Sequence, residues 1–111
     1  MLHARFDERG EALLVTPFAR RLDAKLATHF TAVVGERARG RRLVVVSLAH
    51  VVAIDASGLA SLVAILKRMA PGGTLRLLHV PSAVRTLLEA TFLDELFPAF
   101  DDVDTALRAS R

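Results

Sequence analysis

Two kinds of apolar pattern alternate along the chain. Continuous apolar runs are typical of buried strands, whereas apolar residues that recur every three or four positions are typical of amphipathic helices. Strands are predicted around Phe6 and over residues 12–16, 42–48 and 74–79, with a turn at residues 8–10. Helices are predicted from Asp23 to before Gly40, from Ser57 to before Pro71, from Ser82 through Leu88, and from Asp101 or Asp102 through Leu107. Residues 93–97 are expected to be a short helical or irregular segment.

This order of elements predicts an α/β fold in one domain over residues 1–111. Strands that alternate with helices form a mostly parallel sheet with helices packed against it, so we expect a mixed sheet of roughly four to five strands against four to five helices. The run Leu43–Val46 has no polar alternation, which favours a strand buried on both faces. Neither a linker nor an internal repeat interrupts the pattern.

Composition narrows the class of protein. With 52% hydrophobic and 24% charged residues among 111, the chain has enough apolar surface for a compact core, and disorder is not expected. Cysteine is absent, which excludes disulfides and thiolate chemistry. The first residues do not form a signal peptide, and the apolar runs are too short to span a bilayer. A cytoplasmic protein without direct membrane insertion is therefore expected.

The net charge of +3 raises the question of nucleic-acid binding. Four arginines, Arg37, Arg39, Arg41 and Arg42, cluster around a glycine, as they would in a basic patch. The chain has no tryptophan or tyrosine with which to stack bases, and the same cluster fits a solvated turn between a helix and a strand. The turn is the favoured interpretation, and no nucleic-acid partner is expected.

Most catalytic and metal-binding patterns are missing. The four histidines, His3, His29, His50 and His79, fall on different predicted elements without the spacing of metal ligands. Asp101, Asp102 and Asp104 lack the remaining ligands of a calcium loop. Ser57 is not in a nucleophile elbow, and a hydrolase would need His50 or His79 beside it as a base. We expect no cofactor, no metal and no enzymatic activity.

One junction remains for function, Asp55-Ala56-Ser57-Gly58-Leu59, where the apolar residues 51–54 lead into a predicted helix. Ser57 could be the N-cap of that helix, with its hydroxyl accepting a hydrogen bond from a free backbone N–H. The same position could instead hold a phosphate, because a helix N-terminus has partial positive charge and unpaired donors. The residues alone favour the cap, and both interpretations stay open at this point.

The junction resembles a STAS domain, especially that of bacterial anti-sigma factor antagonists. In that family an apolar strand ends in Asp-Leu-Ser, and after a short spacer Asp-Ser-Ser-Gly-Leu opens a helix. Here Ser47-Leu48 and the segment 55–59 correspond to these motifs. Segments at residues 21–23, 73–78, 87–88, 93–97 and 105–107 resemble other parts of the family in the same order, so the resemblance covers nearly the whole chain. Departures are Ser47 and Ala56 in place of aspartate and serine, and Arg20 and Phe92 where glycine is usual.

The resemblance implies a phosphorylation switch at Ser57. Its kinase would be a serine-kinase anti-sigma factor with a histidine-kinase-like ATPase fold, which the unphosphorylated protein binds so that a sigma factor is released. Asp55 would support the loop or the kinase contact, and Asp23 would lie near the phosphorylated serine. The expected partner-binding surface consists of Asp23, Asp55, Ala56, Ser57, Gly58, Ala60, Ser61 and Ala64. Within it, Ala60, Ser61 and Ala64 are placed opposite Leu62 and Leu66 on the helix, where small side chains permit close approach.

Two other roles fit the same fold. Accessory subunits of bacterial lipid-transport ABC systems resemble this domain but often have Asp-x-Ala-Gly-Leu at the junction, so the presence of Ser57 argues against that role. Stressosome-type scaffolds also use this fold. A second copy of the chain, in a homodimer, is a further possible partner.

Overall fold

The computed structural model describes residues 2–109 and contains a five-stranded sheet in the order β1-β2-β4-β6-β7. The strands are β1 (Ala4–Arg9), β2 (Ala12–Pro17), β4 (Leu43–Ser47), β6 (Thr74–Leu78) and β7 (Ala99–Phe100). β1 pairs antiparallel with β2, and the other three pairings are parallel. The prediction of a mixed, mostly parallel sheet is confirmed.

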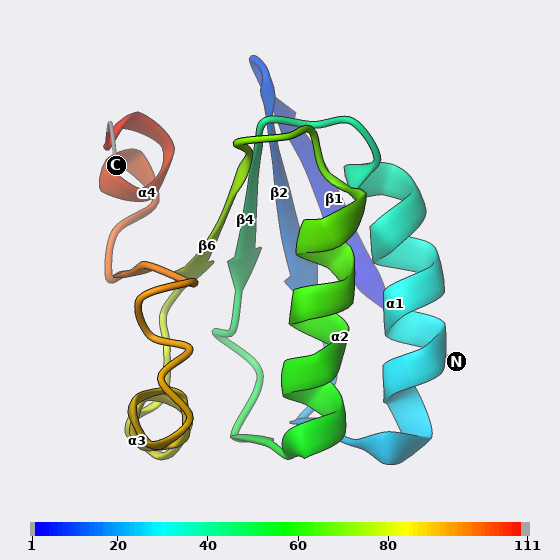
Figure 1. The fold of residues 1–111 in the computed structure, drawn as a ribbon, viewed down its shortest axis with the longest axis vertical. Coiled ribbons are helices and arrows are strands. Elements are labelled where there is room, and N and C mark those ends of the chain that lie inside the picture. Colours follow the sequence, from blue (N-terminus) through cyan, green and yellow to red (C-terminus); the bar gives the residue numbers. More distant parts are fainter. Residues whose placement is uncertain (1, 110–111) are drawn as a thin grey trace.

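Four helices connect or follow the strands in this part of the chain. They are α1 (Ala24–Ala38), α2 (Ala56–Arg68), α3 (Ser82–Ala90) and α4 (Val103–Arg108). Helices α1 and α2 lie side by side against the same face of the sheet, α3 lies toward its β6 end, and α4 lies apart from these three (Figure 1). The α/β class and the predicted number of helices are confirmed.

The central strand β4 joins two apolar layers of unequal size. Val44 and Val46 lie in the main core, which α1, α2 and α3 cover, whereas Val45 points to the opposite face. All three side chains have no exposed surface, as expected for a strand buried on both faces. On the opposite face, Val45 packs with Leu14 and Leu78 beneath α4. This second layer depends on one short helix.

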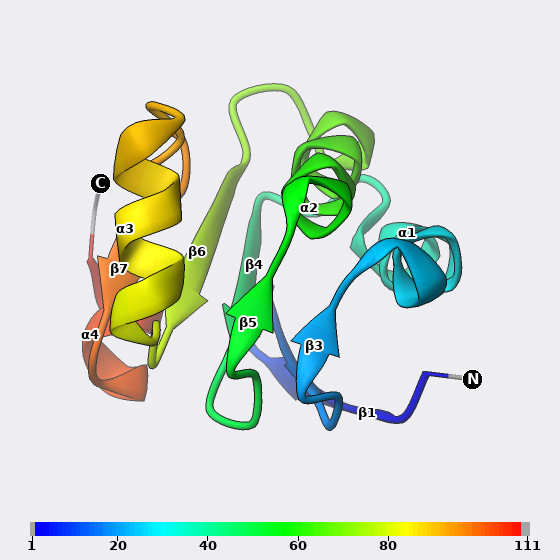
Figure 2. The same cartoon turned by 90° about the horizontal axis from the view of Figure 1, so that it is seen from below.

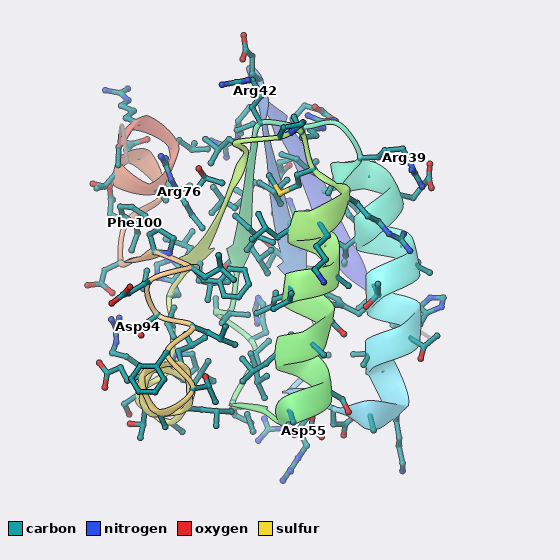
Figure 3. All side chains as sticks on the ribbon, viewed as in Figure 1. Arg39, Arg42, Asp55, Arg76, Asp94 and Phe100 are labelled. Carbon is teal, nitrogen blue, oxygen red and sulfur yellow. The ribbon has the colours of Figure 1, made fainter. Side chains whose placement is uncertain are left out.

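Arg76 fastens that helix to the sheet. Its side chain is only 5% exposed although it projects from the middle of β6. The guanidinium donates hydrogen bonds to the backbone carbonyls of Ala106 and Ala109, at the C-terminal end of α4, and lies over the ring of Phe100. Figure 3 shows Arg76 and Phe100 together on the side of the sheet next to α4. A cation here satisfies carbonyls that the helix itself leaves unpaired.

Three local predictions need correction. The turn predicted at residues 8–10 is displaced, because Glu8 and Arg9 still pair with β2 and the chain reverses at Gly10, which has a φ of 62°. β7 was not predicted as a strand. Two further short strands, β3 (Arg21–Leu22) and β5 (Ala53–Ile54), form a separate parallel pair.

Candidate functional site

The pair β3–β5 brings the beginnings of two helices together. Leu22 is paired with Ile54, and each residue is followed by an aspartate and then by a helix. Seen from below, the two strands lie side by side and lead directly into α1 and α2 (Figure 2). The backbone N–H of Asp55 also donates to the carbonyl of Leu22, at 3.3 Å. Asp23 and Asp55, both predicted site residues, are therefore held at the same end of the molecule.

Each of these aspartates caps its own helix. The carboxylate of Asp23 accepts from the N–H of Lys25 at 3.1 Å, and that of Asp55 accepts from the N–H of Gly58 at 3.0 Å. The interpretation of Ser57 as the N-cap is therefore wrong, because α2 begins at Ala56 and Ser57 already lies inside its first turn. Within residues 2–109 the hydroxyl of Ser57 makes no hydrogen bond. Capping does not account for the serine at this position.

Gly58 is required by a close backbone contact. A Cβ at this position would lie 2.3 Å from the carbonyl oxygen of Leu22 and 2.6 Å from Cγ2 of Ile54. Both distances are far shorter than van der Waals contact, so β3 can pass beneath α2 only because residue 58 has no side chain. Gly58 is buried, and the lack of a side chain there lets the first turn of α2, which contains Ser57, lie close to β3.

A groove runs between α1 and α2 from Ser57 toward Arg68. Its volume is about 510 Å³. From α2 it is lined by Ser57, Ala60, Ser61, Ala64 and Arg68, and from α1 by Ala27, Thr28, Thr31 and Ala32. The structure thus brings the predicted residues Ala60 and Ala64 together with Ser57 in one concave surface. Ala56 is exposed just before this groove, at the first position of α2.

Ser61 has a different position from the one expected. It was placed on an exposed face, but it is only 3% exposed, because that side of α2 packs on α1. Its hydroxyl lies 3.2 Å from the carbonyl oxygen of Ala27 and 3.1 Å from that of Ser57, so its proton can be donated to either. Ser61 forms the floor of the groove and joins the two helices.

Sequence reasoning missed the contribution of α1 to this site. Small residues recur along α1 at Ala27, Thr31 and Gly35, at the spacing of one helix face. Gly35 lies beneath the side chain of Arg68, whose Nη1 would be 2.7 Å from a Cβ added there. These repeated small residues could have indicated from the sequence that α1 takes part in the site. They allow α1 and α2 to approach closely, with a shallow apolar groove between them.

The arginine cluster lies at the opposite end of the molecule. Figure 3 shows Arg39 and Arg42 at the far ends of the elements from Asp55. Arg41 forms a bidentate ion pair with Glu8, with N–O distances of 2.7 and 2.6 Å, and its hydrogen bonds hold the pKa of the Glu8 carboxyl below its ordinary value. Arg37 also approaches Glu8, and Arg39 pairs with Glu36. These contacts fasten the β1–β2 hairpin to the turn after α1, in agreement with the favoured interpretation.

The remaining chemical candidates are separate from Ser57. His50 packs against the ring of Phe18 with a centroid separation of 5.0 Å and lines a different groove, as does Ser47. In the described part of the chain, no three histidine, aspartate or glutamate side chains gather as metal ligands would. No helix within residues 2–109 is both long and apolar enough to cross a membrane.

The capping geometry gives a direct test of the two serine interpretations. We expect Asp55→Ala to lower the free energy of unfolding by about 1 kcal/mol, because it leaves the Gly58 N–H without its acceptor. Ser57→Ala should change it by less than about 0.5 kcal/mol. Urea unfolding followed by far-ultraviolet circular dichroism measures both, with Asp23→Ala as the matched cap of α1. An equal loss in Ser57→Ala would contradict the assignment of Asp55 as the cap.

Solved structures with the same fold come from several bacterial proteins. An anti-sigma factor antagonist from Mycobacterium paratuberculosis superposes with a TM-score of 0.84 at 20% identity, over 98% of this chain and 93% of that one. The anti-sigma factor antagonist SpoIIAA in its unphosphorylated form gives 0.75 at 13% identity, over 96% and 95%. The phosphorylated form from Bacillus gives 0.61 at 12%, over 96% and 98%.

A transport-related protein is also similar. A sulfate transporter family protein from Wolinella succinogenes gives a TM-score of 0.70 at 20% identity, over 89% of this chain and 84% of that one. No curated protein sequence matches the chain significantly. These identities are low, so the likeness to solved structures shows the fold. The model of one family, the STAS domain, matches residues 4–106 and so includes both helices of the groove. The chain therefore belongs to the STAS domain family.

Proposed function

We propose that this protein is an anti-sigma factor antagonist that binds a serine-kinase anti-sigma factor through the first turn of α2 and the α1–α2 groove. Phosphorylation of Ser57 ends that binding. The observation that carries the proposal is the position of Ser57: the residue lines the end of an apolar groove, and its hydroxyl is not used to cap the helix. The proposal describes a cytoplasmic, non-enzymatic regulator of transcription.

A phosphate on Ser57 is compatible with the fold. It would lie in the first turn of a 13-residue helix, where the helix dipole favours an anion. The carboxylate of Asp55 already accepts from the Gly58 N–H, so like-charge repulsion directs the phosphate away from the cap and toward the groove or solvent. The domain can therefore keep its structure while the surface around Ser57 changes.

The same phosphate is incompatible with a partner docked over the groove. It adds about −1.5 to −2 charge at pH 7. A partner seated on Ala60 and Ala64 would have to take this charge out of water, which is costly unless the partner supplies a cation. SpoIIAA, which has the same fold, has been solved in both the unphosphorylated and the phosphorylated form, and this supports the choice of a phosphorylation switch.

The proposal is tested by affinity capture from native-host lysate with four baits. We expect wild type and Ser57→Ala to retain a kinase with a histidine-kinase-like ATPase fold, and Ser57→Glu to lose it. Ser82→Glu is the matched control, because Ser82 is exposed in the first turn of α3, away from the groove. Incubation of the captured kinase with ATP should then phosphorylate wild type and leave Ser57→Ala unmodified.

A different result would favour an accessory role. If all four baits retain the same transporter ATPase, Ser57 is not a switch and the domain is a constitutive subunit. The similarity to a sulfate transporter family protein is the observation that keeps this outcome in view.

A further inference from the structure

The sheet has a second concave surface, on the face that α1 and α2 do not cover. Strand register builds its floor: Arg5 is paired with Thr16 on β2, and Ser47 on β4 is paired with Leu78 on β6. Thr16 and Ser47 follow the paired residues Val15 and Val46, so these four side chains form one row across four strands. The resulting groove has a volume of about 280 Å³.

Helix α4 leaves the β1–β2 side of this face open. It packs over Val45 and Leu78, and its first residue, Val103, forms one wall of the groove. The opposite wall is β1, whose alternating side chains Arg5, Asp7 and Arg9 all project to this face. Figure 1 shows α4 near the β6 strand and away from β1. The groove is thus bounded by a helix on one side and by charged side chains on the other.

An aromatic pair closes one end of the groove. Phe18 and His50 follow β2 and β4 and meet with ring centroids 5.0 Å apart at an angle of 49°. Phe18 keeps 51% of its surface exposed and belongs to neither apolar layer of the fold. An exposed ring in a groove offers a flat surface on which another ring can stack.

The charged side chains in the groove favour a negatively charged ligand. Two arginines, Arg5 and Arg9, line the groove against one carboxylate, Asp7, so it keeps an excess of positive charge. Asp7 pairs with Nε of Arg5 at 3.2 Å, which leaves the two terminal nitrogens of that guanidinium as the donors for a ligand. Ser47 is only 5% exposed, and its Oγ accepts from the N–H of Ala49 at 3.4 Å, while no acceptor for its own proton is found within residues 2–109. These groups are donors for an anion, whereas a divalent cation needs several free oxygen ligands.

From this arrangement we propose that the groove binds a small aromatic anion, such as an aromatic carboxylate or sulfonate. The ring stacks on Phe18, and the anionic group is bound by Arg5, with the Ser47 and Thr16 hydroxyls beneath it. The volume is close to the lower end of about 300–1,000 Å³ for small-molecule sites, which limits the ligand to one or two rings. This site is distinct from the α1–α2 groove and does not depend on the proposed function.

The test uses 5-dimethylaminonaphthalene-1-sulfonate as the probe, because it is a fluorescent aromatic anion of two rings and the chain has no tryptophan or tyrosine to interfere with its fluorescence. We expect the native protein to bind one equivalent saturably. Arg5→Gln and Phe18→Ala should each weaken binding by about tenfold or more. Amide chemical-shift changes on titration should centre on Thr16, Ser47 and His50.

Two matched variants separate this site from other apolar surfaces. Phe92→Ala removes the other strongly exposed phenylalanine, which is 83% exposed, and Arg68→Gln removes the arginine of the α1–α2 groove. Both should bind the probe as wild type does, and thermal unfolding should show that all four variants are folded. The proposal is overturned by the absence of saturable binding to wild type, by unchanged binding in Arg5→Gln and Phe18→Ala, or by loss of binding in either matched variant.

Discussion

Gly58→Ala is expected to lower the free energy of unfolding by about 2–3 kcal/mol, although alanine is the better helix former by about 1 kcal/mol. The new Cβ would lie 2.3 Å from the carbonyl oxygen of Leu22. That oxygen belongs to the backbone and also accepts from the N–H of Asp55, so it cannot rotate away as a side chain would. Relief requires β3 and α2 to separate, which should also displace Ser57 and weaken partner binding.

The matched control for this prediction is the other buried helical glycine. At Gly35 the three atoms nearest to an added Cβ all belong to the side chain of Arg68, which is exposed and can move. Gly35→Ala should therefore be near neutral or slightly stabilising, since the gain in helix propensity remains. Urea unfolding of the two variants decides the matter. Equal stability of Gly58→Ala and wild type would mean that the β3–α2 contact is looser than described.

The second large effect is expected for Arg76→Ala, a loss of about 2–4 kcal/mol. The substitution removes two charge-assisted hydrogen bonds to the end of α4 and leaves a gap beside Phe100. We expect hydrogen exchange to accelerate first in α4 and next in the segment of β6 beneath it. The main core between the sheet and α1, α2 and α3 should keep its protection at low denaturant.

Arg42→Ala serves as the comparison for Arg76→Ala. Arg42 is exposed and forms no ion pair within residues 2–109, so its removal should change stability by less than about 0.5 kcal/mol. A similar small loss in Arg76→Ala would show that α4 is held by its apolar contacts with Val45 and Leu78 alone.

Apolar patterns that extend over several residues made most of the fold predictable. The run Leu43–Val46 predicted a strand buried on both faces, and Val45 is buried there only because α4 covers the second face. The first two helices were predictable because their apolar residues recur on one side. The short pairs β3–β5 and β7 were not, because two residues carry no periodicity and their pairing depends on contacts between distant segments.

The site was predictable in position and less so in detail. The junction at residues 55–59 was found from its sequence, but either Asp55 or Ser57 satisfies the preference for an N-cap, and only the backbone geometry assigns the role to Asp55. In the same way, the need for glycine at position 58 depends on the carbonyl of Leu22 next to it, which belongs to a segment distant in sequence. Ser61 is buried because α1 packs against that side of α2. The sequence of α2 alone does not show which side α1 covers.

The position of α4 has a consequence for synthesis on the ribosome. Leu14, Val45 and Leu78 are translated well before residues 103–108, which cover them. At about 5–20 residues per second, Leu14 and Val45 are made on the order of seconds before α4, so their side of the sheet has no cover until α4 has been added. We expect the nascent chain to be a chaperone substrate during that interval, so substitutions at Arg76 should reduce yield in cells more than their effect on the purified protein implies.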